Sequence, residues 1–387
     1  MKNADFIFQK NTRKKNKYRF NGKTKRIEIV FSKRHINGDA LTELVAIFSS
    51  ILEKYRMVRP PILLNFSDVE FADKLTYITL ECVLLGMIEV HRFDIMLMIS
   101  GENRVTASGW MDSPMIKLSS SNKAERKEFL DKFRFELNRS HCRRLVRECG
   151  DMLAPSRAYD DISDFLRFSG FDFDEGCLDE VTGVIAELIS NAIEHGDNEC
   201  LVDVDIAEGF YHRDDIETHE TEYIVLSLVV LDFSPKLIGE GLKRKMVSNI
   251  DLPDRYKKIS EAFINHETSF DDKYMEEDFY NLAIFQDHIS GRLDQSKSGG
   301  TGMVKLVRAL EERSEGNNCY LLSGKRIITF RKEVMEYDED GWIGFNSEND
   351  FLGAVPDEGI TGLCNLFFPG VAYNLQFIME REKNEDN

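Results

Sequence analysis

The sequence lacks an uninterrupted apolar run long enough to cross a membrane, and it contains no Cys-x-x-Cys pair. A transmembrane helix needs about 20 consecutive apolar residues. Residues 1–18 are charged and polar, without the apolar centre of a signal peptide. The seven cysteines are odd in number and widely spread, which favours neither a disulfide framework nor a zinc site. We therefore expect a cytoplasmic protein with reduced, buried thiols and no membrane partner.

Basic residues are also in short supply, because 68 acidic residues outweigh 50 basic ones and leave a formal net charge of −18. This charge disfavours general binding to DNA or to anionic membranes. The stretch from Lys10 to Arg26 is the exception, since it is rich in lysine and arginine and has no acidic residue. Residues 1–26 are thus a basic N-terminal arm. Contact with nucleic acid or an acidic partner and a simple solvated leader both remain open for it.

Strand and helix patterns alternate through residues 27–112. Short apolar runs predict strands at 26–31, 62–66 and 94–100, and helical periodicity predicts helices at 39–55, behind a cap at Asp39, and at 75–89. Residues 68–73 are expected to form a loop. This alternation predicts a small α/β layer.

The stretch from residue 178 to residue 195 predicts a helix with one apolar face and one polar face. Glu187 and Asn191 are four residues apart, so their side chains point in the same direction. A carboxylate and a carboxamide one turn apart can position a water molecule and ligate a hard cation through oxygen.

Two later segments add to this pattern. Residues 224–232 form a buried-strand run that ends at Asp232, followed by a loop containing Gly239 and Gly241. Residues 296–303 read Ser-Lys-Ser-Gly-Gly-Thr-Gly-Met and lead into a predicted helix at 304–310. A glycine-rich loop at a helix N-terminus presents free N–H groups to phosphate.

The order of these three segments resembles the GHKL (Bergerat) ATP-binding fold found in gyrase B, histidine kinases, anti-sigma factor kinases and heat-shock chaperones. The resemblance implies an α/β two-layer sandwich with a mixed sheet over residues 156–335, in the α+β class. It also implies a lid over about 242–300, where the predicted helices are 242–249, 254–266 and 276–289.

The resemblance implies a role for each matching residue. Asn191 would ligate Mg²⁺ on ATP, Glu187 would polarise the attacking water, and Asp232 would accept a hydrogen bond from adenine. The remaining nucleotide-binding candidates belong to the glycine loops: Gly239, Gly241, Lys297, Gly299, Gly300, Thr301 and Gly302. The chain departs from the family's Asp-x-Gly-x-Gly, since Ser234 and Lys236 stand where those glycines belong.

The N-terminal layer resembles STAS domains, which are anti-sigma factor antagonists. The resemblance lies in residues 62–73, Ile-Leu-Leu-Asn-Phe-Ser-Asp-Val-Glu-Phe-Ala-Asp, before a predicted helix. In phosphorylated members a serine follows this aspartate, whereas Lys74 follows Asp73 here. This difference argues against a phosphorylation switch at that position.

Two segments complete the predicted organisation. Residues 113–155 read as a linker and a charged helix over 123–149, serving as a connection, a dimer contact or a packed helix. A hairpin around Gly324-Lys325 is expected to close the ATPase sheet. Residues 336–387 form a C-terminal extension that is too apolar to be simple disorder, so it should dock on the ATPase or on a partner.

The expected function is that of an Mg²⁺-dependent ATPase whose ATP cycle switches its contacts with an unidentified protein partner, in bacterial signalling or phage defence. A protein kinase of the anti-sigma factor or histidine kinase type is the alternative, as is a non-hydrolysing ATP-sensing module. Many GHKL proteins dimerise on binding ATP, so the resemblance also implies a homodimer.

Overall fold

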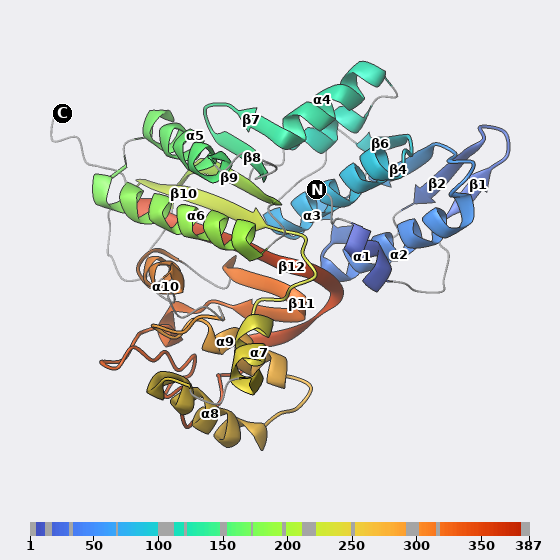
Figure 1. The fold of residues 1–387 in the computed structure, drawn as a ribbon. Coiled ribbons are helices and arrows are strands. Elements are labelled where there is room, and N and C mark those ends of the chain that lie inside the picture. Colours follow the sequence, from blue (N-terminus) through green and yellow to red (C-terminus); the bar gives the residue numbers. More distant parts are fainter. Residues whose placement is uncertain are drawn as a thin grey trace.

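The computed structural model describes residues 5–11, 18–30, 34–66, 69–99, 112–119, 122–147, 153–171, 173–195, 199–210, 222–248, 252–291, 302–314 and 318–380. The protein belongs to the α+β class, and the described residues form a four-stranded sheet, a six-stranded sheet and a two-stranded sheet (Figure 1). Among these residues, no helix is long and apolar enough to cross a membrane. The six described cysteines are all free, and five of them are buried.

The N-terminal layer confirms the predicted alternation of strands and helices. Its sheet has the order β1-β2-β4-β6, in which β2, β4 and β6 are parallel and β1 is antiparallel to β2. The elements are α1 (Asp5–Lys10), β1 (Arg19–Asn21), β2 (Arg26–Val30), β3 (His35–Ile36), α2 (Gly38–Tyr55), β4 (Ile62–Phe66), β5 (Glu70–Phe71), α3 (Lys74–Leu85), the π-helix η1 (Gly86–Val90) and β6 (Ile95–Ile99).

Three details of this layer differ from the predictions. Asn37 rather than Asp39 caps α2, because its side-chain oxygen accepts a hydrogen bond from the Ala40 N–H at 3.1 Å. The expected loop at 68–73 contains β5, which pairs with β3. The basic arm is not simply a solvated leader, since it includes α1, whose Ile7 and Phe8 are buried, and β1; residues 12–17 lie outside the described residues.

The six-stranded sheet has the order β11-β12-β10-β9-β8-β7. The mixed sheet predicted for residues 156–335 is wrong, because every neighbouring pair in this second sheet is antiparallel. The strands are β7 (Phe135–Leu137), β8 (His141–Arg147), β9 (Glu199–Phe210), β10 (Glu222–Leu231), β11 (Tyr320–Thr329) and β12 (Thr361–Glu380).

The helix predicted over 123–149 is wrong in its second half. The 3-10 helix η3 (Pro114–Ser119) and α4 (Lys123–Arg134) precede a turn into β7 and β8. The many charged residues of the segment that forms β8 led to the prediction of an exposed helix. The strand forms because β9 supplies its hydrogen-bonding partner, and the buried Arg143 finds carboxylate partners within the fold.

The predicted hairpin at Gly324-Lys325 is also wrong, because β11 runs through it as one continuous strand. Gly324 has a φ of +60° and lies at register shifts in the pairing with β12, so it forms a β-bulge rather than a turn. The partner strand comes from the segment predicted to be an extension. β12 lies between β10 and β11, which makes residues 361–380 part of the sheet itself.

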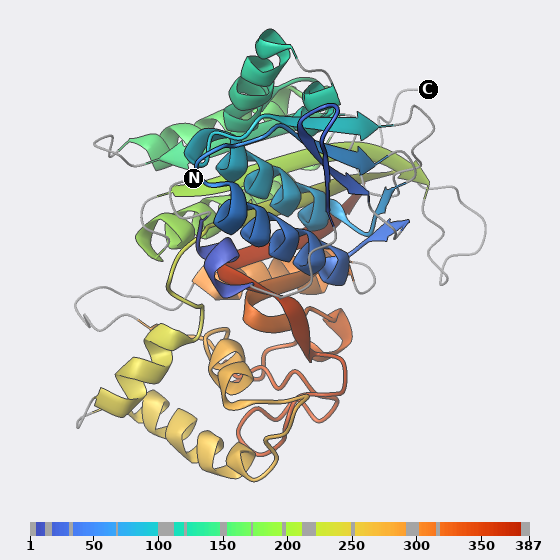
Figure 2. The same ribbon diagram turned by 90° about the vertical axis from the view of Figure 1, so that its right-hand side faces the viewer.

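The helices predicted at 178–195, 242–249, 254–266, 276–289 and 304–310 are present, and a further helix, α5, precedes them. They are α5 (Ala154–Phe168), α6 (Glu175–His195), α7 (Glu240–Ser248), α8 (Asp254–Glu267), α9 (Glu276–Ala283) and α10 (Gly302–Arg313), and α9 ends earlier than expected. In Figure 2, α7 and α8 form a lobe below the sheet with segment 331–360, which includes the 3-10 helix η5 (Lys332–Val334). Asn265 on α8 donates to the Leu352 carbonyl in this segment at 2.9 Å.

Both faces of the six-stranded sheet are covered. Even-numbered residues of β9 and β10, such as Val204 and Leu228, join the core formed with α5, α6 and α10. Odd-numbered residues such as Leu201, Val229 and Leu231 join the core of the N-terminal layer. This alternation follows from the two-residue period of a strand. It places Asp232 on the face that carries α6 and α10.

Candidate functional site

The polar face of α6 brings Glu187 and Asn191 together as the sequence predicts. Both side chains are half-buried, and Asn191 Nδ2 donates to Glu187 Oε1 at 3.2 Å. The opposite face of the helix is packed into the core through Val184, Leu188 and other apolar residues. The hydrogen bond uses the amide nitrogen of Asn191 and leaves its Oδ1 free of that contact, which is the atom a cation would take.

Gly302, the first residue of α10, lies directly against Glu187. A Cβ added at Gly302 would overlap the Glu187 carboxylate, so a residue with a side chain does not fit here without displacement. The contact joins α6 to the N-terminus of α10, where backbone N–H groups lack partners within the helix. Lys297, Gly299, Gly300 and Thr301 lie outside the described residues.

Asp232 follows β10 and is buried, with 2% of its surface exposed. Its Oδ1 accepts a hydrogen bond from the Val371 N–H at 2.8 Å, and its own N–H donates to the Val371 carbonyl at 3.0 Å. Burial raises the pKa of this carboxyl to about 7. Among the described residues, Val371 is the only donor to the carboxylate.

Two residues of β12 also lie beside Asp232, and the sequence analysis did not identify either of them as part of the candidate site. Gly370 has a φ of +93°, and a Cβ there would overlap the Asp232 carboxylate. Tyr373 is buried in register with Val230, and burial raises the pKa of its phenol, with Asp232 and Glu187 adding to the effect. Tyr373 thus lies within the electrostatic reach of both carboxylates, on the face that carries α6 and α10.

The glycines after Asp232 pack at the base of the predicted lid. The Gly239 N–H donates to Asn281 Oδ1 at 3.0 Å, and a Cβ at Gly239 would lie 2.8 Å from the Asn281 nitrogen. A Cβ at Gly241 would approach the Gly291 carbonyl at 3.2 Å. Close packing against α9 and residue 291 therefore accounts for both glycines. Their contact with a nucleotide remains a prediction.

A second polar cluster fills the seam between the N-terminal layer and the six-stranded sheet. Lys74, at the start of α3, is 4% exposed and lies 2.7 Å from Asp203 Oδ1. The same ammonium group pairs with Asp205 and donates to the Ser227 carbonyl at 3.1 Å. Lys74, the residue that follows Asp73, is therefore a buried cation that joins the two layers.

Arg143 extends this seam cluster from β8. Its guanidinium pairs with Asp203 and lies 2.8 Å from Glu81 Oε2, and all three side chains are buried. Burial alone would raise the pKa of Asp203, but Arg143, Lys74 and His141 hold it well below the usual value. The alternation of valine and aspartate at 202–205 was the available sequence indication, since it places two carboxylates inside a buried strand.

Comparison of this chain with protein family models, curated proteins and solved structures finds no match. Function is therefore inferred from the geometry of the residues above. A half-buried carboxylate and carboxamide at a helix N-terminus, with a buried acceptor on the same sheet face, can bind a phosphate-bearing ligand and its cation.

Proposed function

We propose that the chain binds Mg²⁺ and ATP between α6, α10 and the end of β10, and uses ATP hydrolysis to switch its contacts with a protein partner. The contact between Glu187 and Gly302 is the observation that carries this proposal. It joins two segments that are far apart in sequence and that the GHKL resemblance assigns to one nucleotide.

The donor set fits this ligand. Asn191 would ligate Mg²⁺ through Oδ1, while its Nδ2 holds Glu187. Glu187 would orient the attacking water and accept its proton. Asp232 would accept the amino group of adenine with the oxygen that Val371 does not occupy. When bound, ATP supplies a γ-phosphate whose transfer to water drives the change of conformation.

Two segments of the chain lead away from the proposed site: the lid helices α7–α9 and the strand β12. The lid helices α7–α9 begin after Asp232 and end before Gly302, so both ends of the lid segment adjoin the proposed site. β12 holds Asp232 from the side and packs against α1, α2 and α3 of the N-terminal layer. Asn11 exchanges two hydrogen bonds with the Phe367 backbone, at 2.8 and 2.9 Å. A shift of Asp232 on nucleotide binding would thus be transmitted through β12 to the helices of the N-terminal layer.

Hydrolysis is favoured over transfer to the chain's own N-terminal layer. The position that carries the acceptor serine in phosphorylated STAS domains is Lys74, which is buried and paired with Asp203 and Asp205. An amine held in this way offers no hydroxyl group to a γ-phosphate. A kinase acting on a separate protein remains the alternative outcome of the experiment below.

Calorimetric titration with Mg²⁺ and a non-hydrolysable ATP analogue tests the proposed site. Binding should weaken at least tenfold in Asn191→Ala and in Asp232→Ala, since each loses a contact to the ligand. Asp179→Ala is the matched control, because Asp179 is also on α6 but 72% exposed and paired with Arg167, and it should bind as the wild type does. Absence of binding to the wild type, or equal binding by all variants, would refute the site.

Glu187→Gln separates binding from chemistry. The variant should retain analogue binding and lose phosphate release by about 100-fold or more, the usual effect of removing a general base. Label from γ-phosphate appearing on a protein rather than as free phosphate would identify a kinase. Unchanged phosphate release would exclude Glu187 from the reaction.

A further inference from the structure

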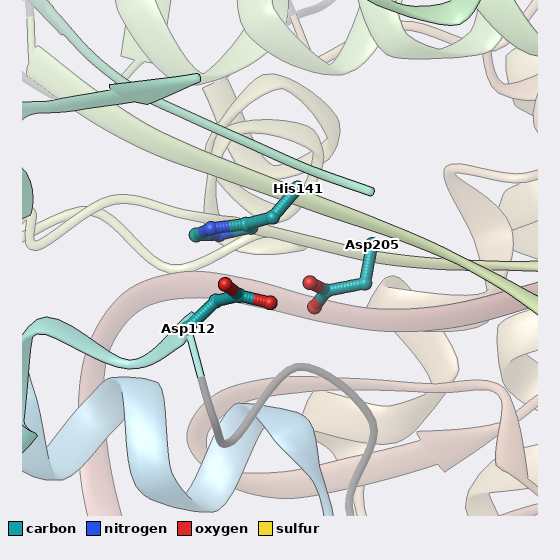
Figure 3. A group of neighbouring side chains, drawn as sticks. All are labelled: Asp112, His141 and Asp205. Carbon is teal, nitrogen blue, oxygen red and sulfur yellow. The ribbon is translucent and has the colours of Figure 1, made fainter. Parts of the chain in front are cut away.

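We propose that Asp112, His141 and Asp205 form a site for one divalent transition-metal cation, with zinc the best fit, in the seam between the N-terminal layer and the six-stranded sheet. Each residue offers one ligand atom, and these atoms all lie within 4.8 Å of one another. Figure 3 shows the imidazole and the two carboxylates facing a shared space, from β8, from β9 and from the segment just before η3. Nothing in this proposal depends on nucleotide.

His141 provides the most specific part of the site. Its side chain is 1% exposed, and its Nε2 lies 3.1 Å from Asp203 Oδ2. Its Nδ1 is buried and has no hydrogen-bond partner among the described residues. A histidine that ligates a metal through one nitrogen commonly donates its other N–H to a carboxylate, which fixes the tautomer and the ring. The pair with Asp203 supplies that arrangement, and a cation would satisfy Nδ1.

The two carboxylates are also held in place. Asn138 Nδ2 donates to Asp112 Oδ1 at 3.0 Å. Asn138 Oδ1 accepts from the His141 N–H at 2.8 Å, so one residue positions two of the three ligands. Asp205 is anchored by its ion pair with Lys74. Such supporting contacts are typical of metal ligands.

The charges of the seam leave room for a cation. Asp112, Asp203, Asp205 and Glu81 carry up to four negative charges, while Lys74 and Arg143 supply two positive ones. The carboxylates therefore outnumber the two fixed cations, which favours a bound cation in the seam. Imidazole and carboxylate ligands together suit zinc or manganese better than magnesium, which prefers oxygen alone.

The position of the site indicates a structural role. Asp112 leads into η3, which packs against β6 and α4, whereas His141 and Asp205 belong to the six-stranded sheet. A bound cation would therefore join the two layers at the point where the seam reaches the surface, since Asp112 is half-exposed. Metal binding should raise the melting temperature of the whole chain.

The test uses the full chain, stripped with a chelator and dialysed, and titrates it separately with Zn²⁺, Mn²⁺ and Mg²⁺ without nucleotide. Zinc should bind at one equivalent, tighter than magnesium, and raise the melting temperature. Asp112→Ala should weaken zinc binding at least tenfold, because it removes a charged ligand. Asp112 is chosen because it is half-exposed, so its loss leaves the buried part of the seam intact.

Asp131→Ala is the matched control, since Asp131 lies on the neighbouring α4 with 59% of its side chain exposed and outside the cluster. X-ray absorption of the zinc complex distinguishes the site from the chain's thiols, and it should report nitrogen and oxygen ligands only. Sulfur ligands, no stoichiometric binding, or equal affinity in Asp112→Ala and Asp131→Ala would each overturn the proposal.

Discussion

Two groups of polar residues, on opposite faces of the six-stranded sheet, differ in how fully their charges are paired. Toward the N-terminal layer, Lys74 and Arg143 are buried and both pair with the buried Asp203. Toward α6 and α10, Glu187 and Asn191 are half-buried, and Asp232 has one donor among the described residues. Buried charges that are paired hold two layers in one arrangement. Polar groups with unused bonding capacity, placed in a protein interior, are typical of ligand sites.

The largest expected effect comes from breaking the paired face. Lys74→Met leaves Asp203 and Asp205 buried with one cation fewer, which should lower the free energy of unfolding by about 3–5 kcal/mol. Urea unfolding measures this change. Adding Asp205→Asn to Lys74→Met should recover part of the loss, because it removes one of the uncompensated charges. Equal instability of the single and double variants would show that lost packing, and not charge, dominates.

The next effect concerns the opposite face and has the opposite sign. Burial raises the pKa of Asp232 to about 7, so the folded state retains a proton that the unfolded chain releases at about pH 4. The stability of the wild type therefore falls as pH rises from about 4 to 7 through this carboxyl. Asp232→Asn abolishes the penalty and should be more stable than the wild type at pH 8, by up to about 4 kcal/mol.

Unfolding of both proteins at pH 4 and at pH 8 checks this sign. The difference between them should be small at pH 4, where the folded carboxyl is protonated and the unfolded one still holds its proton about half of the time, and large at pH 8. The variant should also bind the ATP analogue more weakly, as expected for a residue that lowers stability in exchange for binding. The same stability difference at both pH values would contradict the assigned pKa.

The smallest effect is expected at the contact between α6 and α10. Gly302→Ala places a methyl group on the Glu187 carboxylate and should cost about 1–3 kcal/mol of stability. Phosphate release should fall as well, because Glu187 must move. Gly183→Ala is the control within α6, since nothing lies within 4 Å of its added Cβ, and it should be neutral or stabilising by about 0.5–1 kcal/mol. Equal stability and equal phosphate release in the two variants would contradict the contact between Glu187 and Gly302.

The spacing of apolar residues correctly predicted the strands and helices that pack into the core through one apolar face or run. Strand β4 matches the expected 62–66, and the helices at 254–266 and 178–195 are present with shifted ends. The same spacing gave wrong predictions where pairing with a segment far along the chain determines the secondary structure. The charged residues of β8 become a strand only because β9 pairs with it, and Gly324 forms a bulge only because β12 lies beside β11.

The candidate site divides in the same way. Glu187 and Asn191 follow from helical spacing, and their shared direction is confirmed. Gly370 and Tyr373 could not be found from the sequence, since they reach Asp232 only through the pairing of β10 with β12. The seam cluster was missed because its residues come from α3, β8 and β9, and only the folded chain brings them together.

The place of β12 between β10 and β11 has a consequence for synthesis on the ribosome. β10 is complete at residue 231 and β11 at residue 329, yet the strand that joins them ends at residue 380. Until that strand emerges, β10 and β11 each present an unpaired edge, and such edges recruit strands from other chains. Chaperone binding to nascent chains should therefore persist past residue 329 and end once residue 380 has left the exit tunnel.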